Sequence, residues 1–262
     1  MANTIYANEI IANKVEDILS THLDMNSFLT VDNSLAEAAG MKKIIHTYTA
    51  SGNVEDLAMG AGNTGDIEVS YTATPYTVGT TQGRFAYYDE EEMADPMVVD
   101  AGIKGLAQTM TNDLTAKAIT ELGKATLTHT IPSTGLDFNT IVDAIAKYPY
   151  EDESGLFLLI NPAMNASLRK NLGDSLKYSE GFARTGYIGS VCGVPVFVSK
   201  AVPANTAFLA TKEAVTCFVK KGSEVEQDRD ANTRKTTVYS RKVMVVALTD
   251  ATRVIKLTPV GK

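Results

Sequence analysis

The sequence predicts an α+β fold, in which an extended hairpin and one long helix precede a compact α/β unit and a closing set of strands. Three observations lead to this prediction. Residues 67–72 alternate between apolar and polar side chains with the period of a strand. Residues 95–122 carry an apolar stripe with the period of a helix. Between residues 130 and 212, segments of both kinds follow one another.

The composition is that of an ordinary globular chain. Its 262 residues are 44% apolar and 21% charged, which is enough to bury a substantial core in one or two domains. The net charge of −7 argues against a protein that coats DNA, because tight binding of nucleic acid requires a basic stripe.

The negative charge is concentrated in one segment. Residues 51–95 hold nine acidic residues against one base, Arg84, so this window carries −8 and the rest of the chain is near +1. Such a segment is either a solvated loop or one that meets a more basic surface, for instance on a neighbouring copy. The composition leaves both interpretations open.

The first segment, residues 1–33, is predicted to form an arm. Ile11, Val15 and Ile18 recur at helical spacing and are followed by polar chain. One amphipathic helix of this kind does not fold alone, so we expect it to lie on another surface. Charged residues such as Glu9 and Lys14 interrupt any apolar run, so neither a signal peptide nor a membrane span is predicted. Synthesis in the cytoplasm follows from this expectation.

The hairpin is predicted over residues 43–89, with a glycine-rich, acidic tip at residues 53–66. Few bulky apolar side chains lie along it, and a two-stranded hairpin is marginally stable in water, so we expect it to rest on another molecule. Its tip contains Gly60, Gly62 and Gly65 in the G-x-G-x-x-G spacing. A dinucleotide site needs a buried strand before this motif and a helix after it, and neither is predicted here. The glycines instead indicate a flexible tip.

The helix at residues 95–122 is the clearest element of the sequence. Asp95 suits its N-cap and Pro96 its first position. Its apolar stripe consists of Ile103, Leu106, Met110, Leu114, Ala118 and Leu122. At about 1.5 Å per residue it spans roughly 40 Å, the length of a spine to which other parts attach.

The last two regions complete the predicted fold. In the α/β unit we expect a helix capped by Asp137, a buried strand at 156–160, a helix at 161–172, and strands at 194–199 and 207–210. Residues 213–262 are predicted to be mostly strands. In that region 242–248 and 253–257 flank a turn at Asp250-Ala251 as in a hairpin.

No signature of catalysis or metal binding emerges. Asp228, Asp230 and Asn232 have the spacing of a calcium loop, but Thr233 stands where such a loop needs glycine. The acids at 89–92 could act as a general acid and base, but their place at a helix start favours interaction with the helix dipole. The three histidines (His22, His46 and His129) lie far apart, and the two cysteines (Cys192 and Cys217) are expected to be buried free thiols in strands. We therefore predict no catalytic residue, no cofactor and no metal.

The order of these parts resembles the Hong Kong ninety-seven capsid fold of tailed phages over nearly all 262 residues. Three weakly specific sequence motifs also resemble those of this family. They are residues 187–196 (YIGSVCGVPV), 199–203 (SKAVP) and 224–230 (EVEQDRD). The resemblance implies an N-terminal arm at 1–42 and an extended hairpin, the E-loop, at 43–89. It implies a peripheral or P domain at 90–129 and 213–262, and an axial or A domain at 130–212.

The resemblance also implies a function. The chain is expected to be a major capsid protein that forms homo-hexamers and homo-pentamers of an icosahedral virion shell, made and assembled in a bacterial cytoplasm. The shell would enclose double-stranded DNA without sequence-specific binding, with portal and scaffolding proteins as partners and no membrane. No long scaffolding segment precedes the arm, so we expect a separate scaffolding protein or none, and assembly without covalent cross-links.

The hairpin is expected to lie over the P domain of the next subunit, with its acids facing bases there, and the run 224–235 to contact neighbours near threefold positions. The candidate contact residues are Glu55, Asp56, Asp66, Glu68, Lys220, Lys221, Glu224, Glu226, Asp228, Arg229, Asp230, Arg234, Arg241 and Lys242. The alternative interpretation of the charged run at 224–235 is a solvated surface that makes no specific contact.

Three other functions stay open. An encapsulin-like compartment shares the fold but encloses a cargo enzyme. A phage tail or tube protein would form rings or tubes. A cytoplasmic enzyme would be a small oligomer with a ligand pocket.

Overall fold

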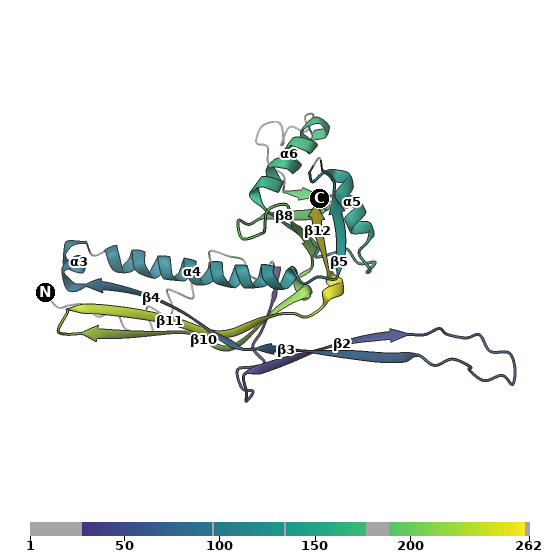
Figure 1. Cartoon of the computed structure of the whole chain (residues 1–262), viewed down its shortest axis with the longest axis horizontal. Helices are drawn as coiled ribbons and strands as arrows, with labels where there is room; N and C mark the ends of the chain where they lie inside the picture. The colour runs from purple at the N-terminus through teal and green to yellow at the C-terminus, as the bar shows by residue number, and fades with distance from the viewer. Residues whose placement is uncertain (1–27, 96, 134, 177–188, 260–262) are drawn as a thin grey trace.

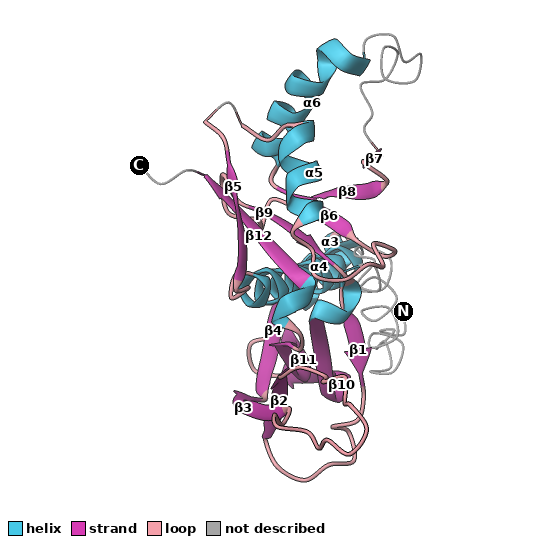
Figure 2. Ribbon diagram, turned by 90° about the vertical axis from the view of Figure 1, so that its right-hand side faces the viewer, coloured by secondary structure: helices cyan, strands magenta, loops and turns pink. Residues whose placement is uncertain are grey.

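The protein, described here by a computed structural model, consists of two lobes and a projecting hairpin (Figure 1). The structure describes residues 28–95, 97–133, 135–176 and 189–259. The arm helix predicted within residues 1–27 and the start of the motif at 187–196 lie outside the described residues. Figure 2 shows the lobes stacked one above the other, with α4 between them.

The first lobe, called the four-stranded lobe, is a sheet with a long helix along one face. Its strands run in the order β1-β10-β11-β4, with β1 parallel to β10 and the other pairs antiparallel. Its elements are β1 (Thr30–Asp32), β4 (Gly79–Tyr88), α3 (Asp89–Ala94), α4 (Met97–Leu122), β10 (Val215–Asp230) and β11 (Lys235–Leu248). The predicted spine helix is confirmed, and every residue of its apolar stripe is buried.

The helix α4 lies very close to β4. A Cβ added at Gly102 of the helix would collide with the ring of Phe85, and one added at Gly83 of the strand would collide with Leu106. Val99, Ile103 and Ala107 of the helix then pack against Val225 and Val238 of the two longest strands. Glycines at the points of closest approach therefore allow the helix to cover the sheet.

The second lobe, called the six-stranded lobe, is a mixed sheet in the order β5-β12-β9-β6-β8-β7. Its strands are β5 (Leu127–Ile131), β6 (Phe157–Ile160), β7 (Ser190–Val191), β8 (Val194–Val198), β9 (Ala207–Ala210) and β12 (Val254–Pro259). Its helices are α5 (Phe138–Ala146) and α6 (Pro162–Leu176). The predicted cap of α5 is present, since the Asp137 carboxylate accepts a hydrogen bond from the Thr140 N–H at 2.8 Å.

Apolar clusters fill this lobe and the junction between the lobes. One cluster packs α5 and α6 against the six-stranded sheet, with Leu158, Ile160, Leu168 and Leu209 almost fully buried. Another joins the last turns of α4 to both sheets, and includes Leu122, Phe157, Phe208, Cys217 and Met244.

The hairpin extends from the four-stranded lobe as a separate two-stranded sheet of β2 (Lys42–Ser51) and β3 (Glu68–Thr77). Residues 79–88, which the sequence analysis assigned to the hairpin, instead form β4 and pair with β11. The hairpin therefore ends at Thr77. The physical reason is that an isolated long hairpin leaves strand groups unpaired, whereas β4 finds its partner in β11 and its cover in α4.

Two further expectations are corrected at the C-terminal end. Strands β11 and β12 flank the turn at Asp250-Ala251 but do not pair, because β12 pairs with β5 and β9 instead. The turn therefore passes the chain from one lobe to the other. Cys192, expected in a strand, lies in the two-residue turn between β7 and β8 with φ of 54° and is half-buried.

Candidate assembly surfaces

The hairpin has two chemically different faces. In its register Tyr48 lies opposite Tyr71 and Thr49 opposite Ser70. Since successive side chains of a strand point to opposite faces, the residues separate into two sets. The apolar face consists of Ile44, His46, Tyr48, Ala50, Val69, Tyr71, Ala73 and Pro75. The other face begins at the base with Lys43, Ile45 and Tyr76, and beyond them it is polar; this polar face consists of Thr47, Thr49, Ser51, Glu68, Ser70, Thr72 and Thr74.

The apolar face is exposed along most of its length. Tyr48 and Tyr71 are 68% and 67% exposed, and Val69 is 65% exposed. The ring centroids of His46, Tyr48 and Tyr71 lie 6.1 to 6.3 Å apart, so the aromatic groups form one ridge. Exposed contiguous apolar surface of this kind marks a site of interaction with another molecule.

The base of the hairpin is held by its own lobe. Ile45 and Val78 are buried against Phe218 and Ala247 of the four-stranded sheet. Lys220 donates from Nζ to the carbonyl oxygens of Ala38 at 2.8 Å and Gly40 at 2.6 Å, in the loop that leads into β2. The direction in which the hairpin leaves the body is therefore set within the single chain.

The tip of the hairpin is tied together by Glu55. Its carboxylate accepts the backbone N–H of Thr64 at 2.9 Å and the hydroxyl of Thr64 at 2.7 Å. The hydrogen bond from the Thr64 N–H, followed by that from its hydroxyl, lowers the pKa of Glu55. The side chains of Asp56, Asp66 and Glu68 are exposed and make no hydrogen bond or ion pair with other described residues.

The face of the four-stranded sheet that points away from α4 is called the open face. Along β11, Thr236, Val238 and Ser240 are buried on the helix side, and their neighbours alternate onto the open face. The register places Glu224 opposite Arg241, Glu226 opposite Tyr239 and Asp228 opposite Thr237. Between Lys235 and Arg241 the open face is therefore polar and carries charges of both signs, whereas Phe218 and Ala247 on the same side of the sheet are covered by the base of the hairpin.

Several of the predicted contact residues pair with each other on this open face. Arg241 donates from Nε to Glu224 at 2.8 Å and from Nη2 to Glu226 at 2.6 Å. Lys221 Nζ lies 2.9 Å from the same Glu224 carboxylate. The hydrogen bonds from Arg241 and then Lys221 lower the pKa of Glu224 to about 2. Lys242, in contrast, alternates onto the helix side, so the four predicted bases do not form one patch.

Other predicted residues join at the far end of the sheet. Arg229 forms an ion pair of 2.6 Å with Asp89, and Arg234 one of 3.0 Å with Glu90. The Asp230 carboxylate accepts hydrogen bonds from the Asn232 N–H and the Thr233 hydroxyl, which shapes the turn between β10 and β11. The segment with calcium-like spacing is thus a strand end and its turn. The acids at 89–92 form the first turn of α3 instead of preceding α4 directly.

Sequence reasoning missed the apolar face of the hairpin and the role of Lys220. The apolar face had a detectable signal, because His46, Tyr48 and Ala50 alternate with Thr47, Thr49 and Ser51. The role of Lys220 had no signal in the sequence, because the carbonyl groups that accept its hydrogen bonds lie more than 170 residues away in the chain. The G-x-G-x-x-G stretch lies in the tip between β2 and β3, with a strand instead of a helix after it.

The described part of the chain offers little for catalysis. No group of three or more potential metal ligands occurs within it. Burial raises the pKa of both thiols, Cys192 and Cys217, which disfavours the nucleophilic thiolate. No helix among the described residues is long and apolar enough to cross a lipid bilayer.

Comparison with solved structures shows the fold. The mature capsid protein of bacteriophage PhiM1 superposes with a TM-score of 0.68 at 11% identity, over 91% of this chain and 87% of that one. A virus-like particle from Pyrococcus furiosus gives a TM-score of 0.66 at 12% identity, over 97% of this chain and 100% of that one. The α+β fold of the Hong Kong ninety-seven type is confirmed.

Comparison of sequences shows the family. A protein of Staphylococcus phage phiMR11 described as a major capsid protein is 27% identical over 257 residues, which cover 95% of this chain and 92% of that protein. The family model described as phage capsid protein matches residues 70–257. This match includes α4, both long strands and the six-stranded lobe except the last two residues of β12. The chain belongs to the phage capsid protein family.

Proposed function

We propose that the chain is the major capsid protein of a tailed phage, and that hexamers and pentamers of it close into an icosahedral shell around double-stranded DNA. The exposed apolar face of the hairpin carries the proposal. A chain that functioned alone would leave this aromatic ridge in water, whereas a repeated contact between copies would bury it. The role is structural, and the chain has no enzymatic activity of its own.

The proposed contact repeats around a ring. The hairpin of each subunit lies over the four-stranded lobe of the next, with the apolar face turned inward and the polar face toward water. A head-to-tail contact of this kind closes into rings of five or six when the rotation between neighbours fits. Each buried aromatic ring removes about 150–250 Å² from water, and the ring repeats this gain at every subunit.

The structure suggests how the proposed domains divide. The hairpin of residues 42–77 acts as the E-loop, and the four-stranded lobe as the P domain, which includes β4. The six-stranded lobe acts as the A domain, and five or six copies of it meet at the capsomer centre. Of the predicted arm at 1–42, residues 30–32 already form β1 of the four-stranded lobe. The far end of β10 and β11, with the run 224–235, contacts neighbours near threefold positions.

In this proposal the acidic tip orients the encounter between neighbouring subunits more than it strengthens their binding. Asp56 and Asp66 are free to meet bases of the next subunit, where Lys220, Lys221 and Arg241 lie on one side of the sheet, whereas Glu68 lies on the polar face of the hairpin. These bases already have partners in their own chain, so the surface they offer is partly neutralised. Charge complementarity of this kind orients encounter and excludes wrong registers.

The remaining proposed partners follow from the shell itself. A net charge of −7 suits an inner surface that holds packed DNA without adhering to it. A portal protein fills one vertex, and a scaffolding protein assists assembly. Production of the chain with and without the neighbouring structural genes tests whether a scaffold is needed.

The decisive experiment is negative-stain electron microscopy with light scattering on the purified chain and on two double variants. Tyr48→Ser with Tyr71→Ser removes the ridge, and Thr49→Lys with Ser70→Lys alters the polar face at neighbouring positions. We expect closed particles or rings from the wild type and the second variant, and unassembled folded chain from the first. Normal particles from the first variant would contradict the proposed role of the hairpin. A uniform dimer or tetramer of the wild type would contradict the shell.

A nanocompartment is the second candidate, because the likeness to the Pyrococcus furiosus particle extends over 97% of this chain. The contents of particles isolated from the native source separate the two. Nuclease-protected DNA supports the phage capsid, and a single enclosed protein supports the compartment.

A further inference from the structure

The two lobes are joined by a pair of short turns that lie side by side. Of the described residues, three segments cross between the lobes: the link from α4 to β5, and two 3-10 turns. The first turn, η1 (Lys212–Ala214), connects β9 to β10, and the second, η2 (Ala251–Arg253), connects β11 to β12. The carbonyl of Ala214 accepts the N–H of Thr249 at 2.8 Å, and the carbonyl of Arg253 accepts the N–H of Thr211 at 3.3 Å, so backbone hydrogen bonds join the two crossing segments.

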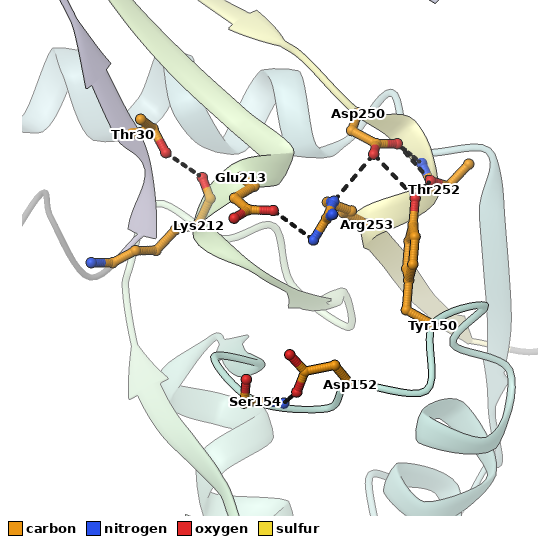
Figure 3. A network of polar contacts seen from close by, with 9 residues as sticks. All are labelled: Thr30, Tyr150, Asp152, Ser154, Lys212, Glu213, Asp250, Thr252 and Arg253. Carbon is orange, nitrogen blue, oxygen red and sulfur yellow. Dashed lines mark hydrogen bonds and ion pairs between the residues drawn. The ribbon is translucent and has the colours of Figure 1, made fainter. Parts of the chain in front are cut away.

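A polar cluster closes over these turns (Figure 3). Arg253 of η2 lies 2.6 Å from the Glu213 carboxylate of η1 and donates from Nε to Asp250 at 3.2 Å. Its guanidinium lies over the ring of Tyr150, 4.6 Å from the centroid. The Tyr150 hydroxyl is 2.8 Å from the Thr252 hydroxyl and donates to Asp250 at 3.3 Å. Tyr150, Glu213, Asp250 and Arg253 are called the clasp.

The clasp connects parts that belong to different lobes. Tyr150 follows α5 in the six-stranded lobe, and its neighbour Tyr148 is buried in the core of that lobe. Glu213 lies two residues before β10, and Asp250 lies two residues after β11, both long strands of the four-stranded lobe. Arg253 therefore ties the loop after α5 to both crossing turns at once.

The clasp differs in kind from the apolar cluster that also spans the junction. The cluster that contains Leu122, Phe208 and Met244 holds the lobes together, but apolar burial is non-directional. A planar guanidinium with two carboxylates and a stacked ring has defined directions. A hollow of about 390 Å³ beside Tyr150, Lys212 and Arg253 leaves space for the loop to shift if the clasp opens.

We infer that the clasp sets the angle between the two lobes, and through it the curvature of the shell. This inference rests on the proposed shell function, because subunits of one sequence build a uniform shell only if their shape is restricted. A subunit with an open clasp samples a wider range of lobe angles. Particles built from it lose their uniform diameter.

Three variants of graded severity test the inference. Arg253→Ala removes the contacts of the guanidinium with Glu213, Asp250 and the ring of Tyr150. Glu213→Gln removes one charge, and Tyr150→Phe keeps the ring but removes the hydroxyl. Lys117→Ala is the matched control, since its 2.6 Å ion pair with Asp113 and its hydrogen bond to Thr81 of β4 both lie within the four-stranded lobe. Hydrogen exchange on the unassembled chain reports opening at residues 211–214 and 249–253, and electron microscopy reports the distribution of particle diameters.

We expect faster exchange at both turns and a broader range of diameters in the order Arg253→Ala, Glu213→Gln, Tyr150→Phe, with the control like the wild type. Unchanged hydrogen exchange in Arg253→Ala and Glu213→Gln would overturn the inference. It would also be overturned if variants whose turns exchange faster still built particles of the same uniform diameter as the wild type. If Arg253→Ala does not fold, the other two variants carry the same comparison. If the wild type forms no shell even when it is produced with the neighbouring structural genes, the proposed function fails, and hydrogen exchange alone decides whether the clasp holds the turns.

Discussion

The molecule contains two long antiparallel ribbons, β2–β3 and β10–β11, and they have opposite surroundings. In β10–β11, apolar side chains such as Val225 and Val238 pack against α4, and Val238 is 1% exposed. In β2–β3 the apolar face has no such cover, and Tyr48 is 68% exposed. The same alternation of side chains thus gives a buried core in one ribbon and an exposed apolar surface in the other. The first ribbon is needed for folding, and we expect the second to be needed only for assembly.

The largest effect should come from loosening the covered ribbon. Ile103 of α4 is 2% exposed and packs against Val225 and Val238. We expect Ile103→Ala to lower the free energy of unfolding by about 2–5 kcal/mol, because the removed atoms leave a cavity. Urea denaturation measures it. The Tyr48→Ser and Tyr71→Ser double variant is the comparison, and should change the same free energy by no more than about 0.5 kcal/mol per site, as exposed substitutions do. A large loss in the double variant would show that the two ribbons do not differ as described.

The covered ribbon was partly predictable from the sequence. The apolar stripe from Ile103 to Leu122 repeats over more than five helical turns. A periodic pattern of that length predicts a helix regardless of the tertiary contacts around it. The cap at Asp137 and the buried strand at 157–160 were likewise local signals, and the structure confirms both.

The pairing of strands was not predictable in the same way. Arg84 pairs with Tyr239, about 150 residues further along, and nothing in residues 79–88 specifies that partner. These residues were therefore assigned to the nearby hairpin. The turn at Asp250-Ala251 looked like a hairpin for the same reason: local chemistry specifies a turn but not which sheet the next strand enters.

The contacts of the charged residues depend on register as well. Glu224 meets Arg241 only because two irregularities in β10 shift the pairing between Val219 and Glu224. A sequence reader sees the same charges but cannot place them opposite one another. The motif order indicated which segments carry contact residues, and the register determines which of those residues are already paired.

The second prediction concerns the base of the exposed ribbon. Lys220 holds the carbonyls of Ala38 and Gly40, and we expect Lys220→Met to free this loop while the core stays intact. Limited proteolysis should then cut within residues 33–41 faster than in the wild type, with a cost to global stability of about 1 kcal/mol, within the usual range for a hydrogen bond. Lys242→Met on the other face of the sheet is the control. Equal cleavage of both variants and the wild type would mean that Lys220 does not hold the loop.

The third prediction separates two acids at the tip of the exposed ribbon. Glu55 binds Thr64 within the tip, whereas Asp56 has no partner among the described residues. We expect Asp56→Lys to slow assembly, measured by light scattering, without changing hydrogen exchange of the tip. Glu55→Lys should change both, because it also breaks the internal hydrogen bonds. Assembly of Asp56→Lys at the wild-type rate would argue that the tip does not meet a basic surface.

The smallest effect is expected on the open face of the covered ribbon. The pKa of Glu224 is lowered to about 2 by its hydrogen bonds with Arg241 and then Lys221, from an ordinary value of 4.5. A group whose folded pKa is depressed adds stability above its unfolded pKa and loses that stability as the pH falls through the folded value. The difference in melting temperature between the wild type and Glu224→Gln should therefore be constant above about pH 5 and shrink between 4.5 and 2. Thr237→Ala, an uncharged change on the same face, should show no such dependence. A Glu224→Gln difference that stays constant down to pH 2 would mean that Arg241 does not hold this carboxylate in the folded chain, and that it is free to meet a neighbouring subunit.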